Sequence, residues 1–487
     1  MRRAGIVLMV CLCLTSCRKA GLRMAEAPWP PLLLSPCHVA RLAEEVLCGA
    51  HDVFEDRQAR SGRTLSIHVT VMPALGRASA PDPLLIFAGG PGQGARGYAA
   101  VVSRFFGRVR RTRDVVLIDL RGTGDSGRLG CPVPADELGQ LRSMLDGDDL
   151  ATRCLASLDA DPRRYTHAAA LADVDEIRQR LGYTKVNLWG GSWGTRAALL
   201  YALTFPQAVR FVVLDGAVPL DMGFPRSVAD DAERAFGLLA ATCVADEACT
   251  RVFGDVRATL GRLLERLEAT PADITLRHPR TGGTETVHLT RDLLAEIVRV
   301  SLYTAADAAR LPQVLAHLDR GDAGPLVAHA TRLASMTTDD MALAATLSVL
   351  CSEDVPLSPG IEFAAGWSET FLQSAYADTW RGRCLSWPRG PALTFPDNAS
   401  SPAPALILSG AHDPVTPPRW GERMRAHFPF SLHIVVPGAA HNTSFSGCVP
   451  DLIARFLDTG PDSLGDTSCV DRVRWPPLVV SDAGTAP

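Results

Sequence analysis

The sequence contains few lysines, no basic excess and no long apolar run. Only Lys19 and Lys185 are lysines, and the formal net charge is −4 at pH 7. This balance offers no basic face to a nucleic acid, so we expect no nucleic-acid partner. The apolar run from Ile6 to Leu14 is too short to cross a bilayer as a helix.

Patterns that would hold a metal or a phosphate group are also absent from the sequence. There is no C-x-x-C spacing and no Cys/His cluster, so we expect no metal. The glycine-rich stretch "DLRGTGDSG" after residue 118 lacks the G-K-[ST] of a phosphate-binding loop. We interpret it as a structural turn in which Arg121 pairs with an aspartate, and we expect no cofactor.

The N-terminus has the shape of an export signal. In "MRRAGIVLMVCLCLTSC", two arginines precede the apolar run. The ending Leu-Thr-Ser-Cys resembles a bacterial lipobox, whose cysteine, here Cys17, is lipidated. An ordinary signal peptide with a chance cysteine is the alternative. Arg18 rather than Asp follows Cys17, which in enteric-type bacteria favours the outer membrane. We therefore expect a signal over residues 1–17, a tether over 18–36, and an exported, membrane-anchored lipoprotein of the outer membrane or periplasm.

Ten of the thirteen cysteines lie beyond this signal. An even number of cysteines in an exported chain indicates disulfides, although sequence alone does not fix their connectivity. Pairing of neighbours along the chain is our interpretation: Cys37–Cys48, Cys131–Cys154, Cys243–Cys249, Cys351–Cys384 and Cys448–Cys469.

Short apolar runs bounded by Gly, Pro or Asp indicate strands buried on both faces of a parallel sheet. They cover residues 84–88, 115–120, 186–189, 212–214, 405–409 and 433–436. Helical patterns lie between several of them, for example over 170–182. The alternation predicts an α/β fold with a mostly parallel sheet. Two further strands around Ser61-Gly62 indicate an antiparallel edge.

The alternation stops between about residues 218 and 395, where helical spacing dominates, as over 257–270 and 291–303. We interpret this stretch as a helical cap inserted into the α/β domain. The predicted domain then consists of residues 37–217 and 396–487, with an irregular tail after Cys469.

The residues Gly190-Gly191-Ser192-Trp193-Gly194 form a G-x-S-x-G motif. A strand-like run precedes it and a helical run follows, which is the context in which such a serine acts as a nucleophile. A glycine-rich turn containing a serine by chance is the alternative. The nucleophile needs a base and an orienting acid, in the chain order Ser, Asp or Glu, His. Asp413 and His441 follow two predicted strands in that order. The rival histidines are His412, His427 and His433, for which loop, helix-end and strand roles are expected.

An oxyanion hole is expected beside this serine. The backbone N–H of Trp193, the residue after the nucleophile, is one predicted donor. The second comes from the loop in "LLIFAGGPGQG". Pro91 has no N–H, so Gly90 is the predicted donor, with Gly89 beside it. An ordinary tight turn is the alternative.

Taken together, "GGPG", "DLRGTGDSG", "GGSWGT", "HDPVTP" and a late histidine resemble the proline iminopeptidase and tripeptidyl aminopeptidase group of α/β-hydrolases. The likeness runs from Cys37 to Cys469 and is strongest for the exported branch, which has similar Cys243/Cys249 and Cys448/Cys469 pairs. It implies the triad Ser192, Asp413 and His441 and cofactor-free removal of N-terminal residues from peptides. Ala88 stands where proline iminopeptidases usually have histidine, and Trp193 where the exported branch commonly has tyrosine.

An aminopeptidase must bind a charged amine, for which buried carboxylates are suited. Glu353 and Asp354, after an apolar helical run, are the predicted candidates, and two solvated loop acids are the alternative. We therefore expect a serine hydrolase acting on peptides with a free N-terminus. An esterase or lipase on the same scaffold and a non-catalytic binding protein are the other hypotheses. The sequence carries no indication of an oligomeric state.

Overall fold

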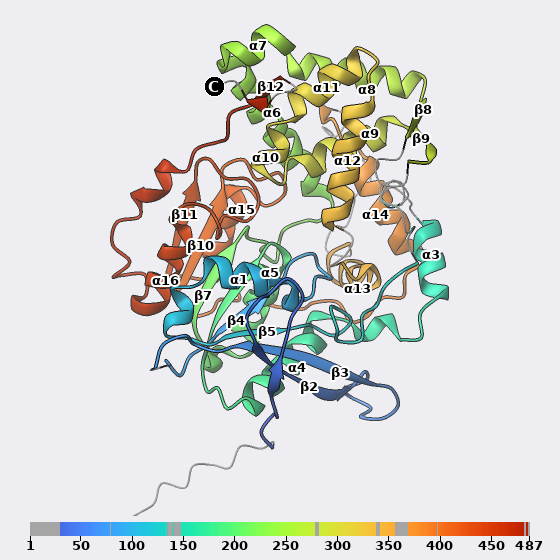
Figure 1. Ribbon diagram of the computed structural model, residues 1–487. Helices are drawn as coiled ribbons and strands as arrows, with labels where there is room; N and C mark the ends of the chain where they lie inside the picture. Colours follow the sequence, from blue (N-terminus) through green and yellow to red (C-terminus); the bar gives the residue numbers. More distant parts are fainter. Residues whose placement is uncertain are drawn as a thin grey trace, which may run out of the picture.

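A nine-stranded sheet with helices on both faces forms the body of the protein, and a helical cap lies above it (Figure 1). This computed structural model describes residues 30–77, 79–132, 134, 140, 148–277, 282–337, 341–355, 369–396, 398–481 and 484–485. The predicted signal, Cys17 and most of the predicted tether lie outside these residues. No helix in the described part is long and apolar enough to cross a membrane.

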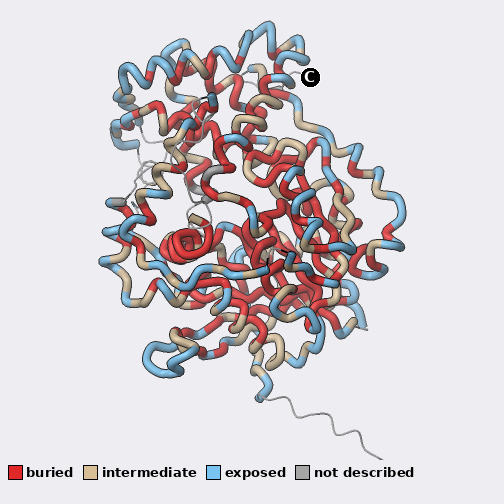
Figure 2. The backbone as a smooth tube through the Cα atoms, turned by 180° about the vertical axis from the view of Figure 1, so that it is seen from behind, coloured by how far each residue is buried: buried red, intermediate tan, exposed pale blue. Residues whose placement is uncertain are grey.

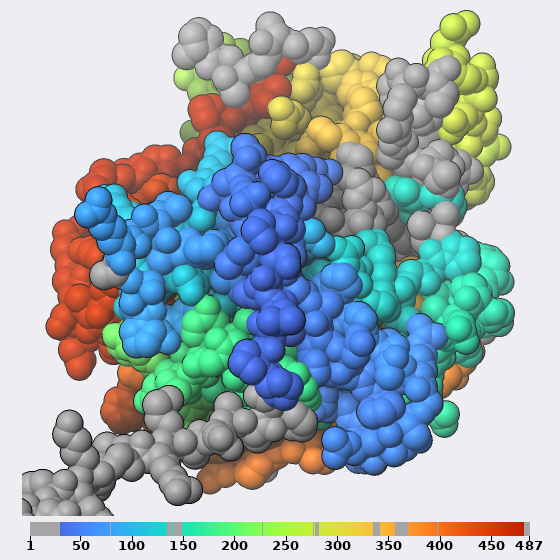
Figure 3. Space-filling model, turned by 60° about the horizontal axis from the view of Figure 1, so that its bottom comes forward, coloured from blue at the N-terminus to red at the C-terminus, as the bar shows by residue number. Residues whose placement is uncertain are grey.

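The strand order is β1-β2-β3-β5-β4-β6-β7-β10-β11. The six strands from β5 to β11 run parallel, and β1, β2 and β3 add an antiparallel edge. The first described residues of the chain, in dark blue, lie at the surface in Figure 3. The expected α/β fold and its antiparallel edge are therefore confirmed. The strands are β1 (Ser35–Cys37), β2 (Val46–Phe54), β3 (Thr64–Met72), β4 (Leu84–Phe87), β5 (Val115–Ile118), β6 (Val186–Gly191), β7 (Val209–Asp215), β10 (Ala405–Gly410) and β11 (Ser431–Val436).

Successive side chains of the central strands enter two different cores, because a strand alternates its faces. Leu85 of β4 packs with α4 (His167–Arg180) and α5 (Trp193–Thr204), whereas Leu84 packs with α1 (Ala99–Phe105) and α16 (Val449–Thr459). Both residues are at most 2% exposed. This double burial explains why these strands are apolar throughout, and it appears as the red centre of Figure 2.

The cap is mainly helical and has its own hydrophobic core. It also contains a hairpin, β8 (Ala272–Arg277) and β9 (Thr284–Leu289), that the helical pattern did not predict. The hairpin strands alternate exposed residues with half-buried or buried ones, a weak signal in a helix-rich stretch. The cap helices are α6 (Arg226–Ala245), α7 (Glu247–Phe253), α8 (Val256–Ala269), α9 (Arg291–Ser301), α10 (Ala305–Ala308), α11 (Leu311–Asp319), α12 (Gly324–Thr337) and α14 (Ala375–Ser386).

Three segments lie in other parts of the fold than the predicted domain boundaries assign to them. The edge strand β1 begins inside the predicted tether. Helix α13 (Leu343–Val349) packs into the core of the α/β domain together with α3 (Asp148–Ala156), although it lies within 218–395. The tail returns to the cap, where the N–H of Val479 in β12 (Val479–Ser481) donates to Ala309. The tail is therefore ordered over β12, although an irregular tail was predicted.

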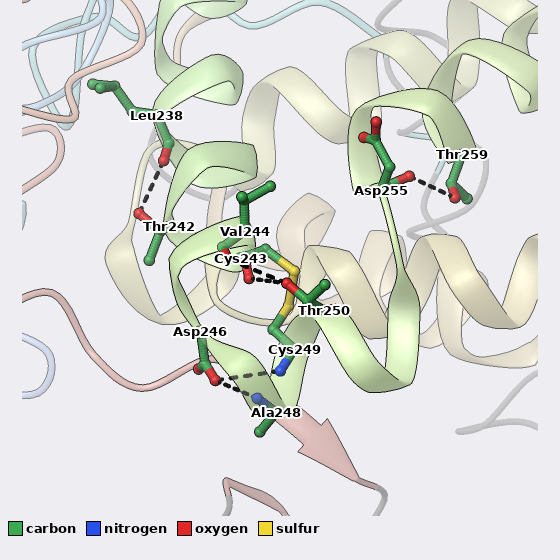
Figure 4. Close-up of a disulfide and its surroundings, with 10 residues drawn as sticks. All are labelled: Leu238, Thr242, Cys243, Val244, Asp246, Ala248, Cys249, Thr250, Asp255 and Thr259. Atoms are coloured by element: carbon green, nitrogen blue, oxygen red, sulfur yellow. Dashed lines mark hydrogen bonds between the residues drawn. A yellow bond between two sulfur atoms is a disulfide. The ribbon is translucent and has the colours of Figure 1, made fainter.

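The ten cysteines form five disulfides with the neighbour pairing predicted from the sequence: Cys37–Cys48, Cys131–Cys154, Cys243–Cys249, Cys351–Cys384 and Cys448–Cys469. Cys243–Cys249 joins the end of α6 to α7 (Figure 4). Between these cysteines, the Asp246 carboxylate accepts the N–H groups of Ala248 and Cys249 and so caps α7. The disulfide and the helix-capping contacts of Asp246 together fix the corner between α6 and α7 in the cap domain.

Candidate active site

Ser192 occupies a strained turn between β6 and α5. Its φ of 55° and ψ of −124° lie outside the regions that side-chain-bearing residues usually adopt. A side chain at Gly190 would collide with the carbonyl of Gly194, and one at Gly194 with the carbonyl of Phe87. Ser192 itself is half-buried, although the residues around it are buried. The tight turn thus needs both glycines and presents the serine at the carboxyl end of the sheet.

Asp413 and His441 are in direct contact. The first lies in the loop between β10 and α15 (Pro418–Met424), and the second follows β11. Asp413 Oδ2 lies 2.8 Å from His441 Nδ1. Thr416 adds its hydroxyl to the same carboxylate oxygen at 2.8 Å and lies 3.1 Å from His441 Nδ1. The N–H groups of Val415 and Thr416 donate to the other oxygen. The carboxylate is therefore held by its own loop while it orients the imidazole.

The electrostatics of this pair favour the charged form of both residues. Burial by itself would raise the pKa of Asp413, but the neighbouring His441 and the hydrogen bonds outweigh it and hold that pKa below its usual value. Burial would lower the pKa of His441, but Asp413, and more weakly Asp215, outweigh it and raise that pKa. Such a pair stabilises an imidazolium, which a general base becomes after it takes a proton.

Asp215, at the end of β7, connects the serine turn to the histidine loop. Its backbone carbonyl accepts the N–H of Ser192 at 2.7 Å. Its carboxylate accepts the N–H groups of Thr443 at 2.8 Å and Ser444 at 2.7 Å, just after His441. Gly216 follows with φ +73°, and a side chain there would approach the His441 ring. Asp215 therefore fixes both the Ser192 turn and the loop that follows His441 at the end of β7. The sequence showed Asp215 only as a polar residue closing an apolar run.

The loop after β4, Gly89-Gly90-Pro91-Gly92, lies beside Ser192 and is called the glycine loop below. A Cβ at Gly89 would come within 3.2 Å of Ser192 Cβ. The Gly89 carbonyl accepts the N–H of Gln93, so the Gly90 N–H, on the other side of the same peptide plane, points away from Gln93. The N–H of Trp193, at the first position of α5, has no acceptor within its own helix. Gly90 and Trp193 therefore remain the two predicted oxyanion donors.

Helix α13 supports the glycine loop from outside, which the sequence did not indicate. The Thr346 hydroxyl donates to the carbonyl of Pro91 at 2.5 Å, and the Ala342 N–H donates to that of Gly92 at 2.9 Å. A side chain at Gly92, where φ is +109°, would strike the Thr346 hydroxyl. These contacts are between residues about 250 positions apart in the chain, so no local pattern could have revealed them.

Glu353 and Asp354 lie in a π-helical turn, Leu350–Asp354, that continues α13. They are 1% and 0% exposed, so they are not solvated loop acids. Glu353 accepts the backbone N–H of His167 at 2.8 Å and also contacts His167 Nδ1. Asp354 Oδ1 pairs with Arg196, whose guanidinium lies 4.6 Å from the Trp193 ring.

The two oxygens of Asp354 differ in their surroundings. Asp354 Oδ2 is buried and has no hydrogen-bond partner among the described residues. Burial raises the pKa of Asp354 to about 6, and Arg196 opposes this rise. One oxygen of Asp354 thus retains the capacity to accept a hydrogen bond, whereas both oxygens of Glu353 are engaged.

The remaining titratable candidates have other partners. His412 stacks on Trp475 with ring centroids 4.1 Å apart, His427 contacts the carbonyl of Ala399, and His433 contacts Ser409 and Glu422. Arg121 pairs with Asp173, in line with the structural turn predicted for its loop. Within the described part of the chain, no group of three or more His, Cys, Asp or Glu side chains could hold a metal ion.

Comparison with known proteins identifies a family and several relatives. The model of the alpha/beta hydrolase fold family matches residues 82–447. The serine protease Hip1 of Mycobacterium tuberculosis is 26% identical over 492 residues, covering 92% of each chain. The tripeptidyl aminopeptidase of Streptomyces coelicolor is 28% identical over 194 residues, or 36% of each chain. The solved proline iminopeptidase of Mycobacterium smegmatis has 15% identity and a TM-score of 0.43, covering 85% of this chain and 98% of its own.

The family match extends over the serine turn, the acid loop and the histidine loop. The relatives named as peptidases agree with the resemblance drawn from the sequence motifs. The chain therefore belongs to the alpha/beta hydrolase fold family, as a serine hydrolase whose relatives include peptidases.

Proposed function

We propose that this protein is an exported serine aminopeptidase that releases N-terminal residues, as proline or as di- or tripeptides, through an acyl-enzyme. The observation that carries the proposal is the Asp413–His441 contact of 2.8 Å at the strand ends where the strained Ser192 turn also lies. The peptidase names of the relatives support the choice of peptides over esters.

In the proposed reaction, His441 takes the proton of the Ser192 hydroxyl as the oxygen attacks the scissile carbonyl. Asp413 stabilises the imidazolium, and the N–H groups of Gly90 and Trp193 stabilise the oxyanion. The imidazolium then gives its proton to the leaving amine, and the C–N bond breaks. Water attacks the ester with His441 again as base, which releases the acid and restores Ser192.

The acidic turn is our candidate for binding the substrate's amine. Asp354 is preferred over Glu353, because Asp354 Oδ2 has no partner within the described residues while Glu353 already serves His167. An ammonium donor there would form a charge-assisted hydrogen bond in a buried site.

The test compares two chromogenic peptide amides with the same sequence, one with a free N-terminus and one N-acetylated. Wild type and Ser192→Ala are assayed on both. We expect cleavage of the free form only, and its loss in the variant. Equal cleavage of both forms, or no cleavage beside rapid turnover of a short acyl ester, would replace the aminopeptidase with a broad hydrolase or an esterase. No reaction of Ser192 with a fluorophosphonate probe would favour a binding protein.

We also propose that the protein is anchored to the membrane through lipid on Cys17, in the outer membrane or periplasm. Five disulfides support an oxidising compartment. Incorporation of labelled palmitate in wild type and its absence in Cys17→Ala would support the anchor. Labelling of both proteins, or of neither, would contradict it.

A further inference from the structure

We propose that two cap residues, Arg234 and Tyr303, are positioning residues that hold the acid and the base of the active site. The inference rests on the proposed roles of Asp413 and His441 and concerns how their loops are kept in place. Both residues lie in the cap, in α6 and just after α9, so the contacts join two parts of the fold.

Arg234 binds the acid loop through two carbonyl groups. One terminal nitrogen donates to Ala411 at 2.9 Å and the other to Asp413 at 2.8 Å. A guanidinium that spans two carbonyls fixes the backbone of the loop more firmly than a single donor would. The ionisable groups that interact with Arg234 include Asp231, Asp413, Arg419 and His412. Arg234 does not touch the Asp413 carboxylate in these contacts, so its action on catalysis is through the backbone.

Tyr303 contacts the base in two ways. Its carbonyl accepts the backbone N–H of His441 at 3.2 Å. Its ring meets the imidazole edge-on, with centroids 5.1 Å apart and an interplanar angle of 70°. The ring therefore restricts rotation of the imidazole. The ionisable groups around His441 are Asp413, Asp215 and Tyr303 itself.

A buried ion pair keeps Tyr303 in place. The Arg299 guanidinium donates to the Tyr303 hydroxyl at 3.1 Å. Glu296 accepts two bonds from Arg299, at 2.7 and 2.6 Å. Glu296 and Arg299 are 4% and 6% exposed, so the pair is largely shielded from water and salt. The cap therefore holds the Tyr303 side chain in a fixed position against His441.

The expected effect is on rate rather than on substrate affinity. Displacement of a catalytic group by about 1 Å can cost on the order of 100-fold in rate. We expect Arg234→Ala and Tyr303→Leu to lower kcat by roughly 10- to 100-fold with little change in KM. A looser Asp413 contact also lowers the pKa of His441, so the acid limb of the pH profile should move to lower pH in Arg234→Ala.

The experiment measures the rate of inactivation by a fluorophosphonate between pH 5 and 9, together with kcat and KM, in the full chain. The probe needs Ser192 and its base but no substrate amine. Arg257→Ala is the matched control, because Arg257 is a cap arginine that pairs with Glu233, next to Arg234, without a contact to the acid loop in the described structure. Arg234→Lys, with a single cationic donor group, should fall between wild type and Arg234→Ala.

Inactivation rates and acid limbs equal to those of Arg257→Ala would overturn the inference. A wild-type protein that does not react with the probe would instead overturn the proposed function, so the two failures are distinguishable. If Arg234→Ala or Tyr303→Leu does not fold, Arg234→Lys and Tyr303→Phe decide. Tyr303→Phe keeps the ring and loses the bond to Arg299, and a several-fold loss of rate is expected. Wild-type rates in both conservative variants would contradict the positioning role.

Discussion

The carboxylate of Asp215 accepts the backbone N–H of Ser444 at 2.7 Å, three residues beyond the predicted base. The backbone carbonyl of Asp215 also accepts a hydrogen bond from the N–H of Ser192. A single buried residue at the end of β7 therefore sets the spacing between the nucleophile's turn and the histidine loop. Burial raises the pKa of Asp215 despite its hydrogen bonds, so its contacts must offset a desolvation cost.

Asp215→Asn should reduce both stability and activity. The N–H groups of Thr443 and Ser444 donate to the two different carboxylate oxygens of Asp215. An asparagine side chain has only one accepting oxygen, so one of these buried N–H groups is left without a partner. We expect the free energy of unfolding to fall by about 1–3 kcal/mol and kcat to fall as well. Denaturant unfolding and steady-state kinetics measure the two effects. Thr443→Val is the control, since it removes only the hydroxyl bond to Asp215. An Asp215→Asn protein with wild-type kcat would contradict the spacing role.

Activity should rise with pH through the pKa of His441. A general base must be neutral, and the pKa of His441 is raised above its usual 6.5. The acid limb of kcat/KM should therefore lie above pH 6.5. Asp413→Asn should lower kcat by on the order of 10⁴-fold, as loss of the triad acid does elsewhere. An acid limb well below pH 6 would show that another group limits the rate.

The same shifts make opposite contributions to stability. The raised pKa of His441 contributes stability that is fully present below about pH 6.5 and is lost as pH rises through the folded-state pKa. The lowered pKa of Asp413 contributes stability that is present above about pH 3.8 and is lost as pH falls through the folded-state pKa. Unfolding curves of wild type and His441→Gln from pH 4 to 9 test the histidine contribution. Parallel pH dependences in the two proteins would exclude it.

Asp354→Asn tests the proposed amine site. The change leaves the Arg196 charge buried without its partner, so we expect a loss of about 3–5 kcal/mol in stability. Beyond this, KM for the free-amine substrate should rise at least tenfold while hydrolysis of a short acyl ester is unchanged. Glu353→Gln is the comparison, because its neighbour His167 occupies both oxygens. Equal losses on amide and ester would assign Asp354 a structural role alone.

Removal of the Cys351–Cys384 disulfide should cost more stability than removal of Cys243–Cys249. The two bonds close segments of 33 and 6 residues, and a longer closed loop restricts the unfolded chain more. The chain-entropy relation gives about 3–4 kcal/mol for the first and about 2 kcal/mol for the second. Double serine variants compared by denaturant unfolding measure the difference. A larger loss for Cys243–Cys249 would point to its cap corner as the more critical constraint.

Thr346→Val should weaken oxyanion stabilisation through the glycine loop. The change keeps the shape and removes the bond to Pro91, so the loop loses its outer support. We expect kcat to fall by about tenfold, less than for loss of a direct oxyanion donor. The loss should be similar on amide and ester substrates, because both form an oxyanion. A wild-type kcat would show that Ala342 and the glycines hold the loop by themselves.

The sequence by itself determined the sheet strands, the serine turn and the order of the acid and base. Each of these features depends on residues that follow one another in the chain. Strands buried on two faces need continuous apolar runs, and the tight turn needs glycines where a side chain would collide. Each is a property of a short segment, which explains why residues 186–194 could be read without the rest of the fold.

Only the tertiary structure decided what surrounds the site. Asp215, Thr346, Arg234 and Tyr303 act on the site through partners far away in the chain, and their own segments carry no mark of those contacts. The same holds for Glu353 and Asp354, whose burial depends on helices packed against their turn. These hydrogen bonds and this burial depend on which distant segments of the chain come into contact in the fold. The residue pattern within one segment does not predict those contacts.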